Sequence, residues 1–547
     1  MKTISIKERP VLWDMLRFSF PVLLMALLQL LLISTDAFTV SRALGDRGLA
    51  AVTNPIYIIY MFLGVVIAMC ASARWYLRRA YQAQRFEEFR SDGRQMFITA
   101  LIGGLIMIPV GAIVAGPLLT MISTPSAIFG LSQSYLMITL CGSLGVLYFA
   151  AAHAVLSAAG QKQTVFLFYC VMFCLNVLLD VLFVNMFGLG TAGAAWATVV
   201  SQLICGIGMR LYLSETSSDC RITFRRVKFA GLFLKPVFQS GLAGSLEFIL
   251  ICFANILMQA SINTFPVAAI AGNGASVILE NLFIMPSLAI ATSIQTFVQN
   301  NDHPGSSQRI RKGEKAAIWM SFAFALGLGI LCVIFSSGLI GIFTASKAAL
   351  DYGMTRTWIC GLFFWALALT YTFSAIFRGA GRSWLSIGCC LVYWCALRIG
   401  LLAIFLPLSR SFALISWVYP ITWLLSALTL GAVYHFDESF SVPKQAATEE
   451  TEVKEADEEP EQIQPAAKSF EITEKEESDS KKTDIPTAAE AMEKPETPAV
   501  PAPAEEPEKP LALSASDLTA PEEEEEATED ENGLITFRKL DDSSKHD

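Results

Sequence analysis

Two polar side chains, Asn176 and Asp180, interrupt a long apolar segment in the first half of the chain. They are four residues apart, so both lie on the same face of a helix. A carboxylate inside hydrocarbon costs roughly 3 kcal/mol or more, and such residues mark ion and proton pathways in membrane proteins. The spacing therefore predicts an ion or proton site.

Asp36 and Thr198 lie in other apolar segments, and the helical rise per residue places them at a depth similar to that of Asn176 and Asp180. Two carboxylates in one small apolar chamber do not both ionise easily, which suits proton exchange. The same oxygens, together with an amide and a hydroxyl, also suit Na⁺. We expect Asp36, Asn176, Asp180 and Thr198 to bind H⁺ or Na⁺. The alternative is that the carboxylates only cap or brace helices.

The second half contains a smaller set of polar groups near the middle of its apolar segments: Glu247, Asn255, Glu280 and Arg398. Arg398 is the only basic residue expected deep inside a segment. One interpretation is a buried ion pair between Arg398 and one glutamate, and the other is a second cation or substrate site. Asn255 alone predicts a hydrogen bond between helices.

The elements that position these residues are membrane spans. The chain is 54% hydrophobic and 16% charged, and its apolar runs are long enough to cross a bilayer. We expect twelve spans, near residues 12–40, 50–76, 94–118, 126–150, 163–186, 191–213, 236–264, 268–297, 315–343, 350–376, 383–406 and 411–435. Pro21 lies within the first span, where it is expected to act as a hinge because apolar sequence continues on both sides.

Charge divides the chain into two parts. Residues 437–547 contain 34 acidic and 11 basic side chains, whereas the part before them has an excess of basic side chains. This acidic tail has too little apolar surface to fold alone and is expected to be disordered. The basic residues of the apolar part gather on one side of the expected membrane, which predicts a cell-membrane protein with both termini in the cytoplasm.

Several motifs resemble the MATE (multidrug and toxic compound extrusion) transporters over roughly residues 1–436. They are Pro21 followed by Asp36, LGDRGLAAV at 44–52, Asn176 to Asp180 followed by GTAGAAWAT at 190–198, and FRGAGRS at 377–383. The resemblance implies two six-helix lobes, at 1–213 and 236–436, joined by a cytoplasmic loop at 214–235 and followed by the tail at 437–547. It also implies a monomer.

The expected function is an antiporter that exports organic, often cationic and amphipathic, compounds in exchange for H⁺ or Na⁺. No GxxxxGK[ST] motif for ATP binding occurs, and we expect no cofactor, no nucleic-acid partner and no enzymatic activity; the partners are small organic molecules and membrane lipids. A flippase for lipid-linked precursors is an alternative with the same architecture, but it would need several deep basic residues. A second alternative is a membrane receptor or scaffold that acts through its acidic tail.

Overall fold

The computed structural model describes residues 11–216, 221–222, 231–301, 307–436, 526–529 and 535–538. The first half of the chain forms α1 (Val11–Thr53), α2 (Ile56–Gln82), α3 (Phe86–Met121), α4 (Ser126–Cys141), α5 (Ser143–Ala158), α6 (Lys162–Asp180), the π-helix η2 (Val181–Met186) and α7 (Gly190–Thr216). The second half forms α8 (Gly231–Ile262), α9 (Val267–Asn300), α10 (Ser307–Ile334), α11 (Ser336–Gly341), α12 (Lys347–Gly361), α13 (Phe364–Gly379), α14 (Ser383–Cys389), the π-helix η4 (Cys390–Leu397), α15 (Arg398–Leu408) and α16 (Phe412–Phe436).

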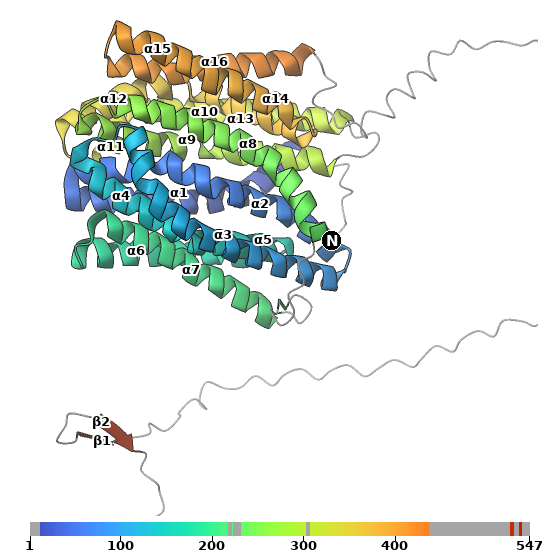
Figure 1. The fold of residues 1–547 in the computed structure, drawn as a ribbon. Coiled ribbons are helices and arrows are strands. Elements are labelled where there is room, and N and C mark those ends of the chain that lie inside the picture. The colour runs from blue at the N-terminus through green and yellow to red at the C-terminus, as the bar shows by residue number, and fades with distance from the viewer. Residues whose placement is uncertain are drawn as a thin grey trace, which may run out of the picture. The chain divides into compact units, whose positions relative to one another are not determined.

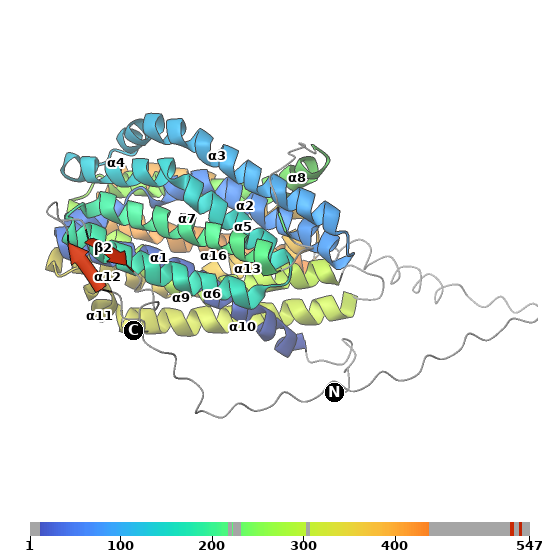
Figure 2. The same ribbon diagram turned by 90° about the horizontal axis from the view of Figure 1, so that it is seen from below.

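The helices lie side by side in one bundle. In Figure 1, α3–α7 form one side of the bundle and α12–α16 the other, with α1, α2, α8 and α9 between them. Seen from below, α3 and α4 lie along one edge and α10 and α11 along the opposite edge (Figure 2). α1 packs along α9, and α2 packs along α8. These four helices therefore form the interface between the two halves.

The number of spans agrees with the sequence. In the described part of the chain, ten helices are long and apolar enough to cross a membrane. Two bent pairs, α4 with α5 (44°) and α12 with α13 (55°), bring the number to twelve if each pair is one span. Large apolar side chains such as Ile113, Trp319 and Leu408 face outward, as expected of a surface in contact with lipid. The fold is thus the expected all-α integral membrane protein.

Several spans end at other residues in the structure than the sequence predicts. α1 continues well beyond residue 40, to Thr53, and its backbone leaves the helical region only at Gly45 (φ 63°). This left-handed conformation is one that glycine adopts without strain, so the chain can change direction there. Helical structure also continues on both sides of Pro21, and the hinge function of this residue stays a prediction. The fourth expected span of each half, at 126–150 and at 350–376, is one of the bent pairs.

Two short strands, β1 (Glu526–Glu529) and β2 (Ile535–Arg538), form an antiparallel pair in the region expected to be disordered. Ile, Thr and Phe in β2 favour extended structure, and the residues between the strands include Asn532-Gly533, a pair common in hairpin turns. The rest of the expected disordered tail, and most of the expected loop at 214–235, lie outside the described residues.

Close helix contacts in the second half depend on glycine. A Cβ at Gly272 of α9 would meet the carbonyl oxygen of Ala349 and would lie 2.7 Å from the backbone nitrogen of Gly353, both in α12. Backbone atoms cannot move aside as a flexible side chain can, so only glycine lets α9 and α12 pack this closely.

We predict that Gly272→Ala lowers the free energy of unfolding by about 1–3 kcal/mol, the usual cost of overpacking. Gly327→Ala in α10 is the matched control, because a Cβ there meets nothing within 4 Å. The control should be neutral or slightly stabilising, since alanine favours helix. Thermal unfolding of the purified protein in detergent measures both, and equal melting temperatures for the two variants would contradict the packing argument.

Candidate ion-coupling site and the buried charges of the second half

Asn176 and Asp180 lie on the last turns of α6, and both are fully buried. The π-helix η2 begins directly after Asp180. Single π turns within helices occur frequently at functional sites. Asn176 contacts Asp36 of α1 and Thr198 of α7, and Asp180 lies near Asp36, so the two side chains share one face of α6, as the four-residue spacing predicts.

Asp36 of α1 is the centre of the first cluster. It is 1% exposed and accepts a hydrogen bond of 2.7 Å at Oδ2 from the Thr198 hydroxyl of α7. The amide of Asn176 donates to Asp36 Oδ1 at 3.3 Å and also to Thr198 Oγ1 at 3.2 Å. Two helices, α6 and α7, thus supply donors to this carboxylate of α1, which offsets part of the cost of burying it.

Asp180 lies close enough to Asp36 for the two carboxyl groups to affect each other electrostatically. Neither carboxylate has a basic partner among the ion pairs of the described residues. Both oxygens of Asp180 and the Oδ1 of Asn176 are buried and accept no hydrogen bond there. A shared proton or a bound cation would satisfy these acceptors. The structure therefore brings together the four residues that the sequence singled out, in a set of oxygen atoms that fits H⁺ or Na⁺.

Tyr135 of α4 is a member of this cluster that the sequence analysis missed. Its hydroxyl donates to Asp36 Oδ2 at 3.5 Å. A tyrosine within an apolar span looks like an ordinary core residue, so no signal in the sequence distinguishes it. In the described part of the chain, no group of three or more His, Cys, Asp or Glu side chains could hold a metal ion.

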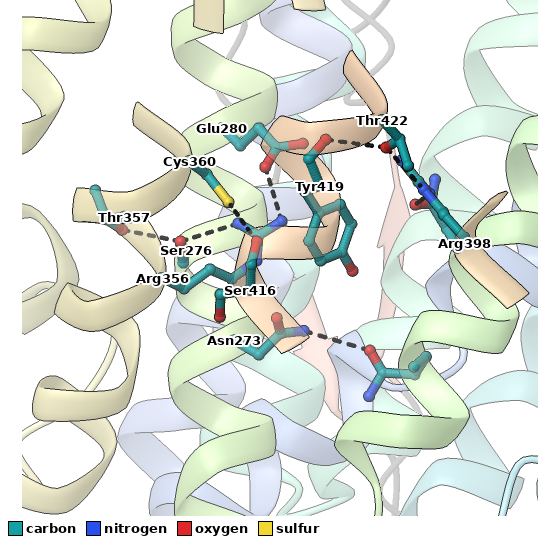
Figure 3. Close-up of polar contacts among 12 residues, drawn as sticks. Asn273, Ser276, Glu280, Arg356, Thr357, Cys360, Arg398, Ser416, Tyr419 and Thr422 are labelled. Carbon is teal, nitrogen blue, oxygen red and sulfur yellow. Dashed lines mark hydrogen bonds and ion pairs between the residues drawn. The ribbon is translucent and has the colours of Figure 1, made fainter. Parts of the chain in front are cut away.

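Two glutamates of the second half, Glu247 and Glu280, are paired with arginines. Glu280 of α9 forms an ion pair of 2.7 Å with Arg356 of α12, which also donates to Ser276 at 3.0 Å. Figure 3 shows this pair beside the ring of Tyr419. Glu247 of α8 forms an ion pair of 2.6 Å with Arg378 of α13.

The expected ion pair between Arg398 and a glutamate is therefore wrong. Arg398 donates instead to the Oδ1 of Asn255 at 2.9 Å and to the Thr422 hydroxyl at 3.3 Å. Because Glu247 and Glu280 already have arginine partners, neither offers the free negative charge that a second cation site would need. The contact with Asn255 is the predicted hydrogen bond between helices.

Arg398 is also not the only deep basic residue, as the sequence analysis assumed. Arg356 is 1% exposed, although it lies near the start of the span expected at 350–376. α12 begins at Lys347, so Arg356 lies in the third turn of the helix and within the bundle. The shortage of deep basic residues no longer argues against a flippase by itself, but two of the three arginines are neutralised by glutamates.

We predict that Arg356→Met lowers the free energy of unfolding by about 3–5 kcal/mol, because it leaves Glu280 buried without its partner. The double variant Arg356→Met/Glu280→Gln should recover most of this loss. An exposed pair, Arg85 with Glu88, provides the control, and Arg85→Met should have little effect. Thermal unfolding distinguishes these cases; a double variant no more stable than Arg356→Met would show that the ion pair is not what Arg356 contributes.

Comparison with known proteins agrees with this architecture. The model of the MatE family matches residues 21–182 and 244–404, more than half of the chain. The probable multidrug resistance protein YoeA of Bacillus subtilis (strain 168) is 24% identical over 353 residues, covering 63% of this chain and 76% of its own length. The probable multidrug resistance protein NorM of Thermotoga maritima is 27% identical over 261 residues, covering 46% and 55%.

Solved structures show the same fold. An inward-facing conformation of a multidrug resistance MATE family transporter superposes with a TM-score of 0.67 at 18% identity, covering 78% of this chain and 99% of that chain. The MATE multidrug transporter DinF-BH also gives a TM-score of 0.67 at 20% identity and covers 80% and 98%. The two blocks matched by the family model lie one in each half of the helix bundle, and the chain belongs to the MATE family of transporters.

Proposed function

We propose that this protein exports organic compounds, often cationic and amphipathic, across the cell membrane in exchange for H⁺ or Na⁺. The observation that carries the proposal is the buried pair of carboxyl groups, Asp36 and Asp180, which have no basic partner in the described part of the chain. A multi-pass arrangement with both termini in the cytoplasm follows from the basic residues that gather on one side of the spans.

The ion would act through the charge of this pair. When H⁺ or Na⁺ is bound, the repulsion between the carboxylates is relieved, and Asn176, Thr198 and Tyr135 hold Asp36 between α4, α6 and α7. When the ion leaves, the two negative charges repel each other and have lost their counter-charge. The positions of α1 and α6 relative to each other therefore depend on ion binding.

Hydrogen bonds join the two halves at one end of the bundle, and these bonds must break for that end to open. The Thr344 hydroxyl, just after α11, donates to Asp46 at 2.6 Å, and Arg42 donates to the carbonyl of Ile342 at 3.3 Å. Gln259 of α8 donates to Asn54, beyond the end of α1, at 3.2 Å. These contacts hold the two halves together at the end where α1 turns into α2. Transporters built from two repeats expose their site alternately by rocking one repeat against the other.

α1 connects the pair of carboxyl groups to the end of the bundle where the two halves are in contact. It carries Asp36 at the site and Asp46 at the contact with the other half, with the change of backbone direction at Gly45 between them. A displacement of α1 on ion binding would therefore reach the closed end directly.

The test is the collapse of an imposed H⁺ or Na⁺ gradient in everted membrane vesicles on addition of a lipophilic cationic dye. We expect the wild-type protein to collapse one of the two gradients, which identifies the coupling ion. Asp36→Asn and Asp180→Asn should slow the collapse by about tenfold or more, because each removes a charge that the ion neutralises. Asp351→Asn, which changes an exposed carboxylate of α12, is the matched control and should behave as the wild type.

Two outcomes would contradict the proposal. If neither gradient responds to a broad panel of compounds while the protein is folded and inserted, antiport is excluded. If a gradient collapses equally in the wild type, Asp36→Asn and Asp180→Asn, antiport occurs but the two carboxyl groups do not couple it.

A further inference from the structure

One buried arginine of the second half has no counter-charge in the described part of the chain. Glu247 and Glu280 are paired with Arg378 and Arg356, whereas Arg398 has no carboxylate partner among the described residues. Arg398 is therefore a buried positive charge that no ion pair of these residues neutralises. The first half has the opposite character, since Asp36 and Asp180 have no basic partner there.

Arg398 lies in neutral surroundings. It is 0% exposed, and its hydrogen bonds go to Asn255 and Thr422, neither of which is charged. Its guanidinium carbon lies 4.6 Å from the ring centre of Trp394 and 5.0 Å from that of Tyr419. Aromatic faces stabilise a cation but do not neutralise it. A buried arginine charge without a counter-ion is costly in a membrane protein.

One nitrogen of the Arg398 guanidinium lacks a hydrogen-bond acceptor in the described part of the chain. Arg398 Nη2 is buried and donates to no acceptor in the described part of the chain. Arginine carries donors only and stays protonated, so neither proton transfer nor cation binding can satisfy this group. An anion can, and the forked guanidinium matches the two oxygens of a carboxylate.

The surroundings of Arg398 extend to the interface between the halves. The ring of Tyr419 also lies 4.8 Å from the guanidinium of Arg356, so it separates the two arginines (Figure 3). Tyr57 of α2, which is partly exposed, lies near both arginines. Because α2 belongs to the first half, this cluster borders the surface where the halves meet. The segment η4, which ends directly before Arg398, is a π-helix, a feature common at functional sites.

We propose that Arg398 binds the carboxylate of a transported zwitterionic or anionic organic compound, at a site separate from Asp36 and Asp180. This proposal rests on the proposed export function. Because Arg398 is fully covered in this conformation, the carboxylate reaches it past Tyr57 and Tyr419 when the halves move apart. A compound with both charges would then place its anionic group in the second half and its cationic group toward the acidic first half.

The test compares a rhodamine dye that has a free carboxylate with its methyl ester, which differs only in lacking that charge. Binding is measured with purified protein by fluorescence anisotropy of the dye, so the result does not require transport. We expect the wild type to bind the acid at least about tenfold more tightly than the ester, the size of effect typical of a buried charged hydrogen bond. Arg398→Gln should abolish the difference by weakening the acid alone, and Arg398→Lys should retain part of it.

The controls separate this proposal from its alternatives. Arg410→Gln removes an exposed arginine nearby in the sequence and should preserve the preference for the acid. Replacing chloride by gluconate tests whether a free anion occupies Arg398 instead; chloride at this site would compete with the acid and leave the ester unaffected. The comparison within the wild type stays decisive even if Arg398→Gln fails to fold, as judged by size-exclusion chromatography.

Equal affinity of the wild type for acid and ester would overturn the proposal, and so would a preference for the acid that survives in folded Arg398→Gln. Failure of the export function has a different signature. In that case the gradients in vesicles would not respond to either dye, whatever the purified protein binds.

Discussion

The structure depends on how a carboxylate is kept inside a membrane protein. Asp36 is buried among α1, α4, α6 and α7, and the hydroxyl of Thr198 and the amide of Asn176 hold its two oxygens. These donors do not neutralise its charge, and the adjacent Asp180 adds a second carboxyl group. We propose that the pair binds a proton or a cation and that the packing of α1 against α6 and α7 depends on whether this ion is present.

The two halves solve the problem of buried charge in different ways. The second half neutralises Glu247 and Glu280 with arginines within hydrogen-bonding distance, and these pairs fix the positions of α8, α9, α12 and α13. The first half leaves Asp36 and Asp180 without a basic partner among the described residues. A fixed ion pair holds its helices in one arrangement, whereas a site that exchanges its counter-ion allows two arrangements. This difference is why we propose ion coupling for the first half and recognition of an anionic group by Arg398 for the second half.

The sequence was informative where a polar residue contrasts with its surroundings. Asp36, Asn176, Asp180 and Thr198 stand out in apolar segments, and the helical rise alone places them at a common depth. Tyr135 was missed because an aromatic residue in an apolar span has no such contrast. The partners of Glu247, Glu280 and Arg398 were not predictable, since they depend on how helices distant in sequence rotate against each other.

Backbone features that depend on tertiary contacts were also not predictable from the sequence. Hydropathy located the twelve spans, but it did not reveal that two of them are bent pairs or that α1 continues to Thr53. The bends lie within uniformly apolar sequence, and the polar segment around Gly45 resembles a loop by composition. The helix there is stabilised by packing of its apolar residues, such as Leu49 and Ala50, against the second half. Such tertiary contacts leave no local pattern.

The most direct measurement of the central claim is the release of the coupling ion from purified protein when a transported dye binds. In weakly buffered detergent solution, a pH indicator follows protons, and ²²Na⁺ follows sodium under matched conditions. The account predicts that saturating dye releases about one H⁺ or one Na⁺ per protein from the wild type, and none from Asp36→Asn/Asp180→Asn. Dye binding of undiminished affinity without release of either ion from the wild type would contradict it.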